Sequence, residues 1–120
     1  MLLLVGLGAC ATISDDLRRA DELYREARYE DAEAWMVALG LERASMEPAQ
    51  RVHFEYLRAM CAYRLDAPED DALHYLLLAD TLARAHPQVL SRRDQEMLAR
   101  ALGEHLRRYR KRRGRGADLE

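Results

Sequence analysis

The chain has 120 residues, of which 49% are apolar and 33% are charged, so it fits one small domain whose core needs no metal or disulfide staple. Few residues are β-branched and no run alternates apolar with polar residues, which excludes a typical β-sheet protein and predicts an all-α fold. The net charge of −2 hides an asymmetry: up to Leu106 the chain carries twelve basic and nineteen acidic residues, and a basic segment follows.

The first ten residues, MLLLVGLGAC, form a short apolar run that ends in small residues before a cysteine. The run is far too short to span a bilayer as a helix. Leu7, Gly8, Ala9 and Cys10 resemble the lipobox of bacterial lipoproteins, in which the cysteine sulfur takes a diacylglycerol and the preceding peptide is removed. No Lys or Arg precedes the run, a departure that leaves two alternatives open: upstream residues are missing, or the match is accidental.

The lipobox resemblance implies a division of the chain and a location. Residues 1–9 would be a signal peptide, truncated if upstream residues are missing, and residues 10–13 a lipidated N-terminus with a short linker. Residues 14–106 would form the folded domain and residues 107–120 a basic tail. Ala11 after the cysteine is not aspartate, which by the enteric sorting rule implies an outer-membrane lipoprotein facing the periplasm. The alternative is a cytoplasmic protein with a frayed apolar N-terminus.

Five helices are predicted after Cys10, joined by loops of a few residues, so that sequential neighbours pack antiparallel. Ser14 can cap the first helix at its N-terminus. The second begins near Tyr29 and ends near Gly40, and Pro48 begins the third.

The last two predicted helices have clear boundaries. The fourth runs from about Glu69 to His86 and is stopped by Pro87. Ser91 and Asp94 resemble a capping box and begin the fifth helix.

The first two helices match the next two at a spacing of forty residues. The matched pairs are Ala20 with Met60, Leu23 with Tyr63, Ala32 with Ala72, Trp35 with Tyr75, Met36 with Leu76 and Leu39 with Ala79. The segment LYREARYEDAEAW resembles the tetratricopeptide repeat well and AYRLDAPEDDALHY less well. We expect Ala32 and Ala72 to pack tightly at helix crossings, and Trp35 to be substantially buried.

The tetratricopeptide resemblance covers roughly residues 17–87 and implies a right-handed array of antiparallel helical hairpins. About two repeats would be followed by a C-terminal capping helix. The spacing exceeds the family's usual repeat of about 34 residues, with the excess in residues 41–47. The alternative is a four- or five-helix bundle with accidental alanine spacing.

The resemblance also implies a concave, partner-binding groove lined by the first helix of each hairpin. Phe54 and Leu57 make the third helix apolar around much of its girth, which indicates contact on a second side, by a partner or by another helix of the chain. The groove residues expected from the spacing are Leu17, Asp21, Tyr24, Phe54, Leu57, Cys61 and Arg64.

The sequence contains no recognisable catalytic or metal-binding pattern. There is no HExxH, no CxxC and no glycine-rich phosphate loop. Cys61 is predicted to be a small buried hydrophobe, because no orienting base lies near it in the sequence. Four histidines are expected at the surface or at helix ends: His53, His74, His86 and His105. We therefore expect a protein that is not an enzyme and has no cofactor, metal or small-molecule substrate.

The basic tail is expected to act by charge, and Gly114 and Gly116 are expected to end the last helix. Its cations are Arg107, Arg108, Arg110, Lys111, Arg112, Arg113 and Arg115.

The sequence leaves two interpretations of the whole chain. The first is a lipid-anchored envelope scaffold, similar in plan to tetratricopeptide lipoproteins that assist assembly of secretins or other outer-membrane machines, whose tail touches an anionic surface. The second is a cytoplasmic helical scaffold whose tail contacts nucleic acid.

Overall fold

The computed structural model describes the backbone of residues 3–118 and the side chains of residues 13–116. Within that range helices joined by short turns make up the chain and there is no strand, which confirms the all-α prediction. The elements are α1 Leu3–Arg25, α2 Tyr29–Leu39, the 3₁₀ helix η1 Gly40–Ser45, α3 Pro48–Arg64, α4 Glu69–Ala85 and α5 Arg92–Asp118. Among the described residues, no helix is both long enough and apolar enough to cross a membrane.

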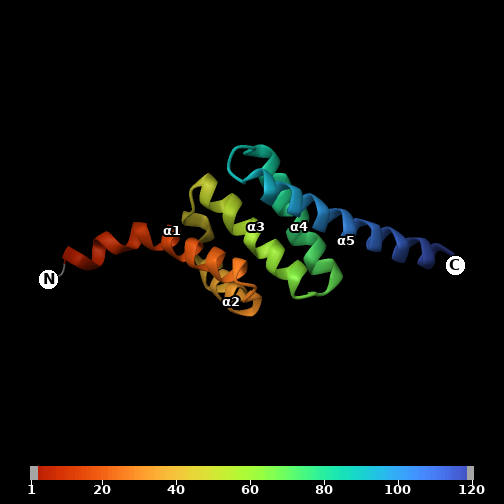
Figure 1. Cartoon of the computed structure of the whole chain (residues 1–120), viewed down its shortest axis with the longest axis horizontal. Helices are drawn as coiled ribbons and strands as arrows, with labels where there is room; N and C mark the ends of the chain where they lie inside the picture. Colours follow the sequence, from red (N-terminus) through yellow and green to blue (C-terminus); the bar gives the residue numbers. More distant parts are fainter. Residues whose placement is uncertain (1–2, 119–120) are drawn as a thin grey trace.

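The helix α3 lies at the centre of the molecule, in contact with all four other α-helices (Figure 1). Each helix packs on the next one in the chain, and α1 and α5 also pack on α3 from opposite ends of the array. The molecule is elongated, at 68 × 27 × 27 Å, and α1 and α5 lead to its two opposite ends (Figure 1).

The predicted end of the second helix near Gly40 is confirmed: α2 ends at Leu39, and Gly40, with a φ of −57°, begins η1. Two other predicted helix boundaries were wrong. Ser14 lies inside α1, because the residues before it continue the helix and leave it no N-terminus to cap. Gly114 and Gly116 lie within α5, since each glycine costs a helix only about 1 kcal/mol and the arginines around them are good helix formers.

Other boundaries were predicted correctly. Pro48 is the first residue of α3, and the backbone N–H of Glu47 donates to the Gln50 side chain at 2.9 Å, a capping interaction that the sequence reading missed. At α5 the Ser91 hydroxyl accepts the Asp94 N–H at 3.1 Å. The Asp94 carboxylate does not complete a reciprocal box; it binds Arg25 of α1.

The turns α1–α2 and α3–α4 share one backbone geometry. Ala27 and Asp66 have φ values of 63° and 54°, and in each turn the next N–H reaches back five residues to a helical carbonyl, as in a Schellman cap. These caps are 39 residues apart, whereas α2 and α4 begin 40 apart, because the second turn is one residue longer. The internal match therefore pairs Ala20 with Ala59, both fully buried, in place of Met60.

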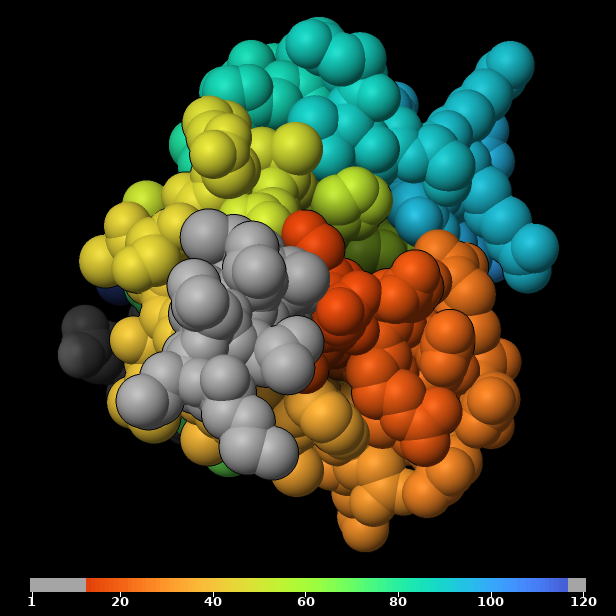
Figure 2. All heavy atoms as spheres, turned by 90° about the vertical axis from the view of Figure 1, so that its left-hand side faces the viewer, coloured from red at the N-terminus to blue at the C-terminus, as the bar shows by residue number. Residues whose placement is uncertain are grey.

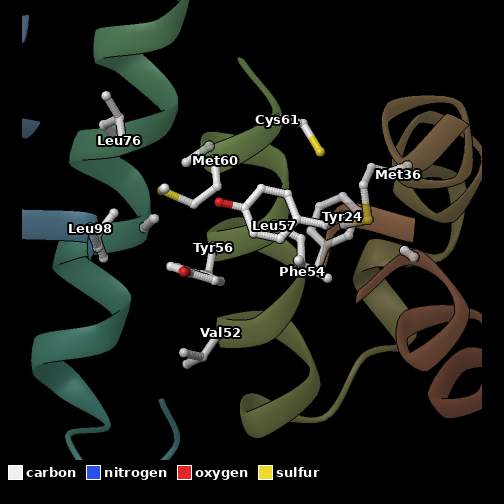
Figure 3. Close-up of a cluster of buried hydrophobic side chains, with 14 of the residues drawn as sticks. Tyr24, Met36, Val52, Phe54, Tyr56, Leu57, Met60, Cys61, Leu76 and Leu98 are labelled. Atoms are coloured by element: carbon white, nitrogen blue, oxygen red, sulfur yellow. The ribbon is translucent and has the colours of Figure 1, made fainter. Parts of the chain in front are cut away.

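The core runs along both sides of α3 (Figure 3). Val52, Tyr56 and Met60 point toward Leu76 and Leu98, while Cys61 and Phe54 lie on the side of Met36 and Tyr24 (Figure 3). Helices α1 and α2 thus cover the second apolar side of α3 that was predicted from its sequence.

The two repeat alanines behave as predicted and the tryptophan does not. Ala32 and Ala72 are fully buried at helix crossings. Trp35 is 38% exposed, so the expectation of its burial was wrong. It borders the buried stripe of α2, and that helix packs only on the neighbouring α1, η1 and α3, which leaves its outer edge uncovered.

The residues between α2 and α3 are held by one buried ion pair. Arg43 of η1 approaches Glu55 of α3 at 2.8 Å, and the Glu55 side chain is only 1% exposed. Burial raises the pKa of Glu55, and the positive charges of Arg43, Arg58 and Arg51 oppose that shift. The segment between α2 and α3 therefore contains a 3₁₀ helix that is fixed to the central helix.

Candidate functional site

Most of the predicted groove residues lie in the core. Phe54 and Cys61 are fully buried, and Leu17, Tyr24 and Leu57 are nearly so. The reason is that α1 and α2 pack directly on α3. The second apolar side of α3 is therefore covered by another part of the chain and not left open for a partner. Of the seven predicted residues, only Asp21 and Arg64 present much surface to solvent.

The clearest hollow on the side shared by α1, α3 and α5 has a volume of about 300 Å³. We call it the Arg–Tyr hollow. Tyr24 and Arg64, both predicted, line it beside residues that the sequence did not single out. Those are Arg25, Tyr29, Tyr56, Arg93, Asp94 and Met97.

Tertiary contacts bring the charges of the Arg–Tyr hollow together. Arg25 bonds Asp94 at 3.0 Å and Asp21 at 3.1 Å, which ties α1 to the start of α5. Figure 2 shows that start, in blue, seated against the α1–α2 end of the molecule in orange. Arg64 donates to the Tyr24 hydroxyl at 3.4 Å, and no ion pair among the described side chains includes Arg64 or Arg93. The hollow therefore presents two uncompensated guanidinium groups.

The Tyr24 and Tyr56 hydroxyls of the Arg–Tyr hollow remain protonated at neutral pH. Burial raises the pKa of Tyr24, partly offset by the nearby Arg64. Burial also raises the pKa of Tyr56, and the negative charge of Asp94 adds to that effect. Two neutral hydroxyls beside two guanidinium groups without an acidic partner favour an anionic, hydrogen-bond-accepting ligand.

Two further hollows divide the remaining predicted residues. One of about 330 Å³ separates α1 from the first half of α3, with Leu17, Leu57 and Asp21 in its lining and a 2.8 Å bond from Gln50 to Ser14 at its edge. The other, of about 400 Å³, lies on the side of α2 and α4 and includes Cys61. Phe54 lines neither of them nor the Arg–Tyr hollow.

Cys61 has the properties of a packed side chain. Burial raises the pKa of its thiol to about 12, and the negative charge of Glu33 acts in the same direction. A protonated, enclosed thiol is a poor nucleophile. The structure thus gives this cysteine the surroundings expected of a small hydrophobe.

One histidine is placed differently from the prediction. His53 and His74 are exposed and His86 follows the end of α4, but His105 is buried in α5 against the edge of the Tyr63 ring. Burial and the charge of Arg108 lower the pKa of His105. Among the described residues no three His, Cys, Asp or Glu side chains gather as metal ligands.

The remaining two predicted sites are at the ends of the chain. Cys10 belongs to the backbone of α1, but its side chain lies outside the described side chains, so lipidation stays a prediction. The basic residues 107–115 continue α5 as helix, and Arg112 bonds Glu69 and Asp70 at the start of α4 at 3.0 and 3.3 Å. The tail is thus partly fixed to the domain by charge.

No protein-family model matches the chain, and comparison with curated proteins and with solved structures also yields no match.

Proposed function

We propose that the chain is a lipid-anchored adaptor of the bacterial cell envelope that binds a protein partner on the side shared by α1, α3 and α5. The Arg–Tyr hollow is the single observation that carries the binding role. Three helices that are far apart in sequence meet there, and two guanidinium groups without an acidic partner border the hollow. Both guanidinium groups are exposed, so they are accessible to a ligand that carries the opposite charge.

The proposal includes a tetratricopeptide-like array. Its support is the order of contacts, in which α1, α3 and α5 pack side by side while α2 and α4 close each hairpin. Small residues at the crossings, including Ala20, Ala59, Ala32 and Ala72, allow the close approach that such hairpins need. In this arrangement the first helices form the partner-binding side, and α5 is the capping helix.

The anchor in the proposal is the thioether lipid on Cys10. Its test is metabolic labelling with a fatty acid, followed by separation of membrane and soluble fractions. Wild-type protein should be labelled and found in the outer membrane, and Cys10→Ser should be unlabelled and soluble. Cys61→Ala is the matched control, because it removes the other cysteine and should leave labelling unchanged. An unlabelled wild type would overturn the anchor and favour a cytoplasmic scaffold.

The binding role has a separate test. A photo-crosslinking residue placed at Arg64 should yield a defined protein adduct in cells. The same residue placed at Arg84, an exposed position on α4, should not. Equal crosslinking from both positions, or an adduct with nucleic acid at Arg64, would overturn a protein-binding face at the Arg–Tyr hollow.

A further inference from the structure

We propose that the exposed face of α5 is a docking track for a carboxylate-rich segment of a partner protein. The track begins at the Arg–Tyr hollow and follows α5 toward the C-terminal end of the molecule. It consists of Arg93, Arg100, Arg107, Lys111 and Arg115. The inference rests on the proposed protein-binding role, but it does not depend on the lipid anchor.

Helical geometry aligns the five cations. Arg93, Arg100 and Arg107 are spaced by seven residues, and Arg107, Lys111 and Arg115 by four, so all five lie on one side of α5. All five are exposed. At a rise of about 1.5 Å per residue the track extends about 33 Å, which suits an extended or helical peptide segment.

The track cations differ from the arginines that are paired with acids, such as Arg18 with Asp15 and Arg84 with Asp80. None of the ion pairs found among residues 13–116 includes a track residue. Glu104 is the one acid on the same face between Arg100 and Arg107, and its carboxylate accepts the Tyr63 hydroxyl of α3 at 2.8 Å. The five cations of the track therefore outnumber the acids on this face.

The structure indicates carboxylates as the complementary groups. On the same helix Arg112 bonds the carboxylates of Glu69 and Asp70, and at the track's beginning Arg25 bonds that of Asp94. Guanidinium groups bind carboxylates through paired, charge-assisted hydrogen bonds. The track repeats this chemistry with cations that form no ion pair among the described residues.

A lipid surface fits the track less well. A helix that lies in a membrane interface needs an apolar face opposite its charges, and residues 110–116 contain no large apolar side chain. The apolar residues of α5 nearest to them, Leu106 and Tyr109, pack against the core. In addition, α5 leads away from the end of the molecule that holds α1 (Figure 1).

Nucleic acid also fits less well. Binding to single strands relies on exposed aromatic side chains that stack on bases. The aromatic rings of α5 are not exposed for stacking: His105 is buried, and Tyr109 is half-buried, with Arg113 over its ring at 5.6 Å. The chain outside α5 carries nine basic and seventeen acidic residues, which repel a long phosphate backbone beside the track.

The test compares two variants of the full chain with equal charge changes. Arg107→Gln with Lys111→Gln removes two track cations, and Arg110→Gln with Arg113→Gln removes two cations outside the track. Binding of a fluorescent glutamate-rich peptide is measured by anisotropy, with a glutamine-rich peptide as the blank. We expect the track variant to bind about tenfold more weakly, as two charge pairs of moderate strength imply, and the control variant to lose less than about threefold.

Five outcomes would overturn the track. Equal losses in the two variants would mean unspecific attraction by charge. Tighter binding of a single-stranded oligonucleotide of matched charge would make nucleic acid the ligand, and tighter binding of vesicles with phosphatidylglycerol would make it lipid. Salt-sensitive self-association that disappears in the track variant would make a second copy of the chain the occupant. Unchanged crosslinking from Arg64 in the track variant would refute the track as a binding surface and leave the Arg–Tyr hollow as the binding site.

Discussion

Arg25 and Asp94 form a 3.0 Å ion pair between residues 69 positions apart in the sequence, and this contact fixes the start of α5 on the end of α1. The Asp94 side chain is only 11% exposed, while that of Arg25 is 49% exposed. The pair therefore holds a nearly buried carboxylate, whose loss of a partner costs more than that of an exposed one.

Arg25→Gln should lower the free energy of unfolding by about 1 kcal/mol, because it leaves the Asp94 carboxylate without its cation. Urea unfolding followed by circular dichroism measures the change. The control is Arg18→Gln, which removes an exposed pair with Asp15 and should cost less than about 0.5 kcal/mol. Equal costs for the two variants would show that Arg25 contributes no more than a surface ion pair.

Ala72→Leu should destabilise the domain by about 1–3 kcal/mol, because Ala72 is fully buried at the crossing of α4 and added methyl groups have no room there. Ala85→Leu on the same helix is the control. Ala85 is exposed, and its replacement should change stability by less than about 0.5 kcal/mol. A tolerated leucine at residue 72 would mean that the crossing is looser than the buried alanine indicates.

Helix periodicity was sufficient to predict the elements of the fold. The positions of Pro48 and of Ser91 with Asp94 located two helix starts to within a residue. Single capping residues predicted a helix start wrongly where the preceding residues were also helical. Ser14 can cap a helix, but it lies in a helix that begins before it. The cap at Ala27 was missed because the residue is not glycine, although the backbone is left-handed there.

The site was less predictable than the fold. Tyr24 and Arg64 were expected in it from their spacing, but Arg25, Tyr56 and Arg93 join them only through the packing of α5 on α1 and α3. No periodic pattern encodes the docking of helices so far apart in sequence. Spacing also placed Phe54 correctly on a second side of the third helix, but it could not show that the chain itself covers this residue.

Ala27→Gly should stabilise the protein by about 0.5 kcal/mol. A non-glycine residue in the left-handed region costs about 1–2 kcal/mol, and glycine removes that strain at the price of a more flexible unfolded chain. Ala27 has a φ of 63°. Thermal and urea unfolding measure the effect.

The same substitution at Ala34, an exposed residue within α2, provides a control of opposite sign. Ala34→Gly should destabilise the helix by about 0.5–1 kcal/mol. If both glycines destabilised the protein equally, the left-handed cap between α1 and α2 would be refuted.

His105 should make the protein less stable in mild acid. Burial and Arg108 lower the pKa of His105 below its ordinary value of 6.5, so the folded state holds the neutral ring while the unfolded chain takes up a proton. The contribution is fully present above pH 6.5 and is lost as the pH falls below it, toward the lowered pKa of the folded state. The free energy of unfolding, measured by urea titration at several pH values between about 7 and 5, should decrease accordingly.

His105→Phe keeps an aromatic ring beside Tyr63 and should flatten this decrease, whereas His53→Gln, at an exposed site, should not. Glu55, whose pKa is raised, gives a dependence of opposite sign in wild type and variants alike, so the difference between the curves isolates His105. Parallel curves for wild type and His105→Phe would show that this histidine does not titrate differently in the folded and unfolded states.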